Sequence, residues 1–153
     1  MRQRSARIVL LTCLAMSVVA CETAETRKQV VRSYLDELLV AQRWQKWDEY
    51  MAKSPSYNGA GLGREAFTGV AHFLNTTFSE LSITIEDQRV DGSWVITRVS
   101  VRGVQTGNFL NVTPRNRAVR FRAILMDRFE SGHVAEMWHQ FDYWDALLQV
   151  ARP

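Results

Sequence analysis

The spacing of apolar residues changes near Glu80, and this change limits the folds open to the chain. Before Glu80, apolar residues recur every three or four positions, which predicts helices near 24–41, 44–51 and 64–79. After Glu80 they alternate with polar residues, which predicts strands over 81–85, 94–101, 119–125 and 133–141. Residues 54–63, with two Ser, three Gly, one Pro and one Asn, predict a loop, and residues 143–150 predict a closing helical turn. Helices followed by a meander of strands predict an α+β domain with the helices on one face of an antiparallel sheet.

A basic start and a short apolar run predict that residues 1–20 are a secretory signal. The run over 8–20 has thirteen residues, whereas a membrane-spanning helix needs about 20. Cys21 follows Val-Val-Ala, which resembles the bacterial lipobox, where the cysteine left by cleavage is acylated. The alternative is an ordinary signal that ends near a cysteine. We expect export to the bacterial cell envelope, a lipid anchor on Cys21, a polar tether over 22–27 and one domain over 28–153.

Charge is balanced once the signal is set aside. The chain has 19 Lys and Arg against 16 Asp and Glu, and three of the arginines but no acid lie in the first twenty residues, which leaves 16 of each sign. A basic face that binds nucleic acid is therefore not expected. The chain has no cysteine after Cys21, so a disulfide within the domain is excluded, and no histidine has a second ligand at a spacing typical of a metal site.

The segment 136–142 carries the richest group of chemical side chains. In a strand, one face presents two carboxylates, an indole and an amide, and these belong to Glu136, Trp138, Gln140 and Asp142. The other face presents Met137, His139 and Phe141. Polar groups among aromatic ones are typical of a pocket lining, where a carboxylate can act as an acid or base. The alternative is a strand edge that faces solvent, and the sequence favours neither.

Motifs in the second half of the chain, in a consistent order, indicate a known family. They are Phe-Ser-Glu-Leu-Ser-Ile at 78–83, Gly-Val-Gln-Thr-Gly-Asn-Phe at 103–109, Thr-Pro-Arg-Asn-Arg at 113–117, the block Arg-x-x-x-Gly-His-Val-x-Glu-x-Trp-x-x-x-Asp at 128–142, and Leu-Leu-Gln at 147–149. In these motifs the chain resembles the SnoaL-like polyketide cyclases, also called ester cyclases, of the NTF2-like superfamily. The resemblance implies an α+β cone, in which a strongly curved mixed or antiparallel sheet is wrapped by three N-terminal helices around a pocket.

The same resemblance implies a reaction and its site. Enzymatic members of the family close a ring in a polyketide ester by an intramolecular aldol reaction, with an aspartate as acid and base and no metal or cofactor. The matching aspartate is Asp142, with Trp138 beside it. At positions near the pocket where the family usually has histidines, this chain has Gln105, either Tyr57 or Asn58, and Met137. The resemblance therefore implies that Gln105, Tyr57 and Asn58 line the pocket.

These matches lead to two hypotheses about function. The first is a cofactor-independent cyclase or isomerase that acts on a small apolar or polyketide-like carbonyl compound. The alternative is a module that binds such a ligand, or a partner, without chemistry. NTF2-like domains often pair through the open face of the sheet, so a homodimer is also expected.

Overall fold

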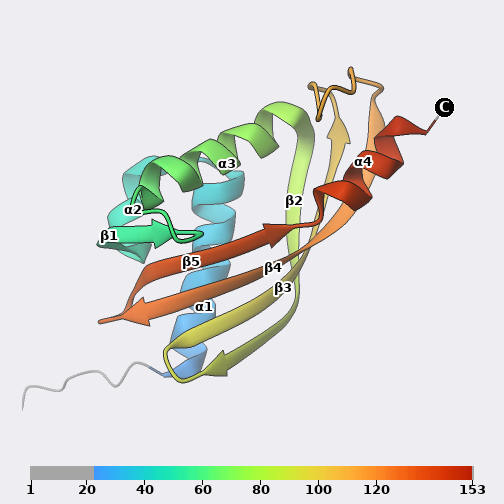
Figure 1. Cartoon of the computed structure of the whole chain (residues 1–153). Helices are drawn as coiled ribbons and strands as arrows, with labels where there is room; N and C mark the ends of the chain where they lie inside the picture. The colour runs from blue at the N-terminus through green and yellow to red at the C-terminus, as the bar shows by residue number, and fades with distance from the viewer. Residues whose placement is uncertain (1–22, 153) are drawn as a thin grey trace, which may run out of the picture.

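A computed structural model of the chain describes residues 23–152, so the predicted signal and Cys21 lie outside the described residues. Within 23–152, no helix is both long enough and apolar enough to cross a bilayer. Five strands and four α-helices form one α+β unit (Figure 1).

The first predicted helix forms, and its second half is π-helical. Helix α1 spans Ala24–Tyr34 and continues as a π-helical stretch, η1, over Leu35–Val40. The hydroxyl of Thr23 caps α1 by accepting a hydrogen bond from the backbone of Thr26 at 3.1 Å. Residues 24–27, which we expected in a tether, therefore form the first turn of this helix.

The second predicted helix is much shorter than its apolar spacing indicates. A 3₁₀ turn, η2, spans Trp44–Lys46, and α2 is a single turn over Trp47–Tyr50. Strand β1 then covers Met51–Tyr57, where the sequence predicts the end of a helix followed by a loop. β1 contains Pro55 and pairs with one neighbour only, and an edge strand tolerates proline because its outer side needs no hydrogen bonds.

The remaining elements agree in type with the prediction. They are helix α3 over Gly63–Thr77, strands β2 over Phe78–Asp91, β3 over Trp94–Gln105, β4 over Arg117–Glu130 and β5 over His133–Phe141, and helix α4 over Tyr143–Ala151. The strand order is β1-β5-β4-β3-β2, and every pair is antiparallel except β1 with β5. The sheet is thus mixed because of its one parallel edge strand.

Helices α1 and α3 cover one face of the sheet, which we call the inner face, and leave the opposite, outer face open (Figure 1). Helix α4 runs beside β4 where β5 has ended, and the Gln149 side chain exchanges two hydrogen bonds with the Arg120 backbone. The strands bend along their length, but the sheet does not curl strongly into the expected cone. Buried side chains of α1, η1 and α3 pack directly on the inner face and form one core with it.

Candidate functional site

Alternation along β5 decides which of its side chains reach the interior. Met137, His139 and Phe141 point inward and are buried, whereas Trp138 is 44% exposed and Gln140 is exposed. The face that carries the predicted polar residues is therefore the outer face. The opposite face of β5, with Met137, His139 and Phe141, lies in the interior.

A cluster of three polar side chains lies on the inner face, and we call it the Asp127 cluster. It joins Tyr34 of α1, Asp127 of β4 and His139 of β5, all of them buried. The Tyr34 hydroxyl donates to Asp127 Oδ2 at 2.8 Å, and His139 Nε2 lies 3.0 Å from Asp127 Oδ1. The Tyr34 hydroxyl also lies 3.4 Å from His139 Nε2. Both carboxylate oxygens of Asp127 are thus engaged in a site from which solvent is excluded.

The two nitrogens of His139 have different surroundings. Nε2 faces a carboxylate, which can only accept, so Nε2 carries the proton in the neutral ring. Nδ1 is buried and has no hydrogen-bond partner among residues 23–152. A buried polar atom without a partner costs about 1–3 kcal/mol. His139 therefore presents a free lone pair in the interior, at a cost to stability.

Aromatic rings and one asparagine fix the position of His139. The Tyr57 ring packs edge-on against the imidazole with centroids 5.2 Å apart, and Phe67 packs in the same way at 6.1 Å. The Asn58 side chain accepts from the His139 backbone N–H at 2.8 Å and donates to its carbonyl at 3.3 Å. Tyr57 and Asn58, which the family resemblance implies as pocket residues, thus lie next to the Asp127 cluster.

Burial keeps the nearby phenols protonated. Desolvation, and then the charge of Asp127 and its hydrogen bond, raise the pKa of Tyr34 well above the ordinary range. Desolvation also raises the pKa of Tyr57, with smaller effects from Tyr143 and Asp127. These side chains therefore remain hydrogen-bond donors at any physiological pH.

Glu136 lies on the outer face in a surface network. It accepts from the Trp138 indole N–H and from Arg128 Nε, each at 2.7 Å. The Trp138 hydrogen bond, and then that of Arg128, lower the pKa of Glu136. The pocket hypothesis needs surroundings that disfavour the charged carboxylate, and here the contacts favour it. Glu136 and Trp138 thus match the alternative that we considered, a solvent-facing strand.

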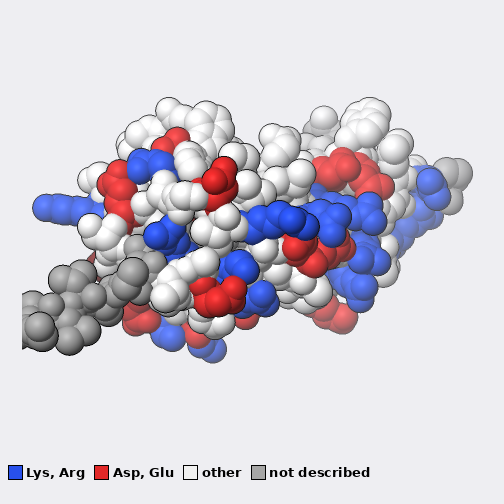
Figure 2. Space-filling view, turned by 90° about the horizontal axis from the view of Figure 1, so that it is seen from below, with Lys and Arg blue, Asp and Glu red and all other residues white. Residues whose placement is uncertain are grey.

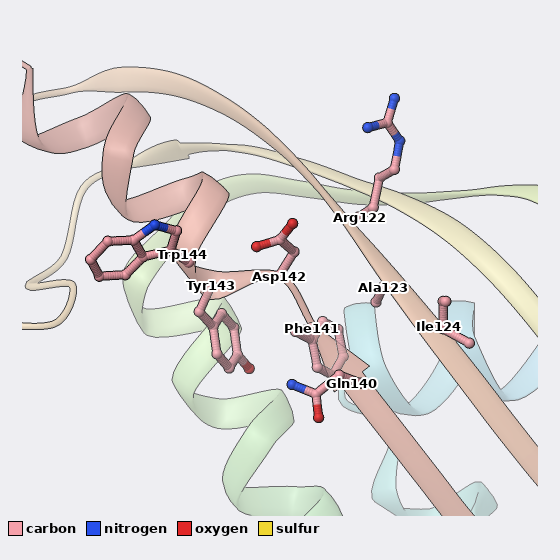
Figure 3. A pocket seen from close by; sticks show the side chains of 8 residues that line it. All are labelled: Arg122, Ala123, Ile124, Gln140, Phe141, Asp142, Tyr143 and Trp144. Atoms are coloured by element: carbon pink, nitrogen blue, oxygen red, sulfur yellow. The ribbon is translucent and has the colours of Figure 1, made fainter.

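Asp142 is exposed and caps the last helix. Its Oδ1 accepts from the Asp145 backbone N–H at 3.0 Å, as expected for the residue before α4. Asp142 and Gln140 line a cleft of about 550 Å³ on the outer side, together with Arg122 and Trp144 (Figure 3). The side chains of Arg122, Asp142 and Trp144 point in different directions around this cleft (Figure 3). It is separate from the Asp127 cluster, which lies on the inner face.

Gln105 is fully buried but does not belong to either site. Its amide nitrogen donates to the carbonyls of Gly107, Val112 and Thr113, and its oxygen accepts from the backbone of Arg115. This side chain therefore holds the loop between β3 and β4. Among residues 23–152, no group of three or more His, Cys, Asp or Glu could hold a metal ion.

The sequence pattern of the SnoaL-like polyketide cyclases matches residues 29–150. This chain belongs to the SnoaL-like polyketide cyclase family. Among solved structures it is similar to TsrD from Streptomyces laurentii, with 19% identity, a TM-score of 0.72 and coverage of 84% of this chain and 96% of that one. It is also similar to a SnoaL-like polyketide cyclase from Agrobacterium tumefaciens, with 17% identity, a TM-score of 0.69 and coverage of 80% and 96%. At such identities these two structures support the fold alone. No curated protein matches the chain.

Two members of the Asp127 cluster were missed in the sequence. Apolar residues occupy the inward positions of β4 at Val119, Phe121, Ala123 and Leu125, and the next inward position is Asp127. An acid at a strand position where the alternation predicts an apolar residue is a signal that could have revealed Asp127. Tyr34 gives no such signal, because a tyrosine fits the apolar side of a helix equally well.

Proposed function

We propose that this chain is an exported, lipid-anchored SnoaL-like protein that moves protons on a small carbonyl compound, with His139 as the base and Asp127 as the residue that orients it. The reaction is a ring closure or isomerisation of the cyclase type and needs no metal or cofactor. The ligand is a small apolar or polyketide-like carbonyl compound. Export through residues 1–20 and acylation of Cys21 are the remaining parts of the proposal.

The single observation that carries the chemistry is the unpartnered Nδ1 of His139. Asp127 holds the opposite nitrogen, which fixes both the ring orientation and the tautomer. Many acid–base sites pair a histidine base with a carboxylate in this way, and the carboxylate stabilises the imidazolium that forms. A histidine kept for packing alone has no need of a free buried nitrogen.

The proton transfers follow from this geometry. Nδ1 accepts a proton from the carbon beside a carbonyl group, and the resulting imidazolium is stabilised by Asp127. The Tyr57 hydroxyl, which stays protonated, donates a hydrogen bond to the enolate oxygen. The enolate carbon attacks a second carbonyl carbon of the same molecule, and the new alkoxide takes the proton back from Nδ1. Since the cluster is closed, entry of the ligand requires Tyr57 and the turn that follows it to move.

Asp142, the base that the family resemblance implies, remains the competing choice. It is exposed, and its side chain already caps the N-terminus of α4. That carboxylate is committed to the cap and open to water, so it is not held toward a buried substrate. Asp127 and His139, in contrast, are both buried and in direct contact with each other.

One exchange experiment distinguishes His139 from Asp142 as the base. The probe is 2-tetralone in D₂O, and proton NMR follows the loss of its C1 protons with and without the protein. We expect exchange faster than in buffer, a fall to the buffer rate in His139→Gln and in Asp127→Asn, and no change in Asp87→Asn, a control that removes a surface acid. Asp142→Asn decides between the bases. Loss of exchange in that variant alone, with His139→Gln still active, contradicts the proposal. Thermal unfolding of each variant confirms that it is folded.

A binding module without chemistry is the second candidate, and the outer cleft favours it. The cleft of about 550 Å³ offers Arg122 and Gln140 beside the apolar side chains of Ile124 and Trp144. Neither Arg122 nor Gln140 forms a side-chain hydrogen bond or ion pair within residues 23–152. Tetralone that binds without exchange, and whose affinity falls in Trp144→Ala but not in His139→Gln, supports this candidate.

A homodimer is a further part of the proposal, and the open outer face is the surface that fits it. This face exposes Ile124, Met126 and Trp138, which lie together on β4 and β5. Light scattering of the domain should give twice the chain mass at micromolar concentration and the single mass for Trp138→Glu. A wild-type monomer at those concentrations contradicts the homodimer.

A further inference from the structure

The described domain begins immediately after the cysteine proposed to carry the lipid. Only two peptide units join Cys21 to Thr23, the residue that caps α1. A chain extends at most about 3.6 Å per residue, so Thr23 lies within about 7 Å of the anchored cysteine. A link this short restricts the orientation of the domain relative to the anchored cysteine.

The start of α1 is also bound to the sheet. Arg27 donates from its guanidinium to the carbonyl of Gly92, in the turn between β2 and β3, and Gln88 of β2 donates to the carbonyl of Lys28. One turn further on, Val31 and Tyr34 are buried in the core. The helix therefore stays against the domain, and the β2–β3 turn lies beside the start of α1.

Strands β2 and β3 lead from that turn to the opposite end of the molecule. β3 has 12 residues, which at about 3.3 Å each correspond to roughly 35–40 Å along the strand. The loop between β3 and β4 and the end of α4 lie at that far end, whereas α1 begins at the near end (Figure 1). The two ends are thus at different distances from any surface that holds Cys21.

From this geometry we infer that a bilayer surface contacts the start of α1 and the β2–β3 turn, and that α4 and the loop between β3 and β4 face the aqueous compartment. The inference rests on the proposed acylation of Cys21. Near this end Lys28 pairs with Glu25 and Arg89 with Asp87, and the view from below shows side chains of both signs (Figure 2). Headgroup charge therefore adds little, and the lipid itself provides the attachment.

The orientation has a consequence for the ligand. The outer cleft is lined by the first residues of α4, including Trp144, and α4 lies toward the far end. A ligand that enters there comes from the aqueous phase and is not drawn from the bilayer. For the second candidate function, binding in the outer cleft, the ligand is then a water-borne carbonyl compound; the Asp127 cluster is separate from this cleft.

The test places one label at each end of the full chain. Ser93→Cys lies in the β2–β3 turn and Thr113→Cys in the loop between β3 and β4, and both positions are exposed. Each variant is produced with its signal, purified in detergent, labelled with a fluorophore and reconstituted into phosphatidylcholine vesicles that contain lipids with a nitroxide on the headgroup. We expect quenching at Ser93 to exceed that at Thr113 several-fold.

Two controls distinguish failure of the orientation from failure of the proposed acylation of Cys21. Mass spectrometry shows whether Cys21 is acylated, and Cys21→Ser, combined with each label, should abolish vesicle binding and quenching at both sites. A chain that is acylated and vesicle-bound, but is quenched equally at the two positions or more at Thr113, overturns the orientation alone. A chain that is not acylated removes the anchor and the orientation together.

Discussion

The two faces of β4 and β5 share the same strands but place acids in opposite surroundings. On the inner face, Asp127 is fully buried and meets a phenol and an imidazole. On the outer face, Glu136 meets Arg128 and the edge of an indole at the surface. The residues of the two faces are neighbours in sequence, so composition cannot separate them. The difference shows that strand phase, more than residue type, decides which acid is buried and which is open to water.

The largest test of this contrast is removal of each acid. Asp127→Ala leaves the Tyr34 hydroxyl and His139 Nε2 buried without their partner, and breaking a buried pair in this way costs about 3–5 kcal/mol. Glu136→Ala removes a pair that water screens and should cost a small fraction of that. Urea denaturation of both variants measures the two values. Equal losses in the free energy of unfolding would contradict the larger contribution expected of the buried cluster. Asp127→Asn is a milder variant that can be measured if Asp127→Ala does not fold.

Adjacent residues of β5 give the next test. Met137 is 0% exposed and Trp138 is 44% exposed. Met137→Ala should lower the free energy of unfolding by about 2–5 kcal/mol because it opens a cavity in the core. Trp138→Ala should cost less, although tryptophan is the larger side chain. A greater loss for Trp138→Ala would mean that its outer face is covered, as in the proposed dimer, and repeating the measurement at several protein concentrations separates the two cases.

The buried phenols predict how stability depends on alkaline pH. Because folding raises the pKa of Tyr34, the folded state favours the neutral phenol. That stabilisation is complete below the ordinary tyrosine pKa of about 10 and is lost as pH rises toward the folded pKa. Each such tyrosine contributes a slope of at most about 1.4 kcal/mol per pH unit above pH 10.

Tyr34→Phe isolates the inner cluster in this pH dependence. Tyr57 and Tyr143 also have raised pKa values, that of Tyr143 at about 12 through burial, so they retain their part of the slope. Denaturation series at pH 9 to 11.5 should show a shallower fall in the variant than in the wild type. An unchanged slope would mean that the Tyr34 phenol is not shielded from water as the structure has it.

Much of the fold follows from the apolar spacing, and the exceptions have physical causes. The α+β class, α3 and the four antiparallel strands were predicted because periods of about four and of two are strong signals. Strand β1 was missed because Pro55 and the serines around it give no alternation, and its position is decided by pairing with β5. The strong curl was expected from the resemblance and is absent from this sheet.

The site was harder to predict than the fold. Segment 136–142 was correctly divided into two faces, but which face lies inside depends on where α1 and α3 pack, which one strand cannot reveal. The Asp127 cluster joins three elements, with Tyr34 105 residues away from His139 in sequence. Such a cluster forms through tertiary packing. Tyr57 and Asn58 were placed beside it only through the alignment with the family's histidines.

The smallest predicted effect concerns Asp142, and it separates a cap from a catalytic acid. Asp142→Ala removes the side chain that accepts from the Asp145 backbone and should destabilise the protein by about 1 kcal/mol. Asp142→Asn keeps a capping oxygen and should cost only a few tenths of that value, with α4 still helical by circular dichroism. The pair matters because Asn preserves the cap but cannot act as a base. If Asp142→Asn is as stable as the wild type yet abolishes tetralone exchange, the outer acid is the catalytic one and the contrast between the two faces reverses.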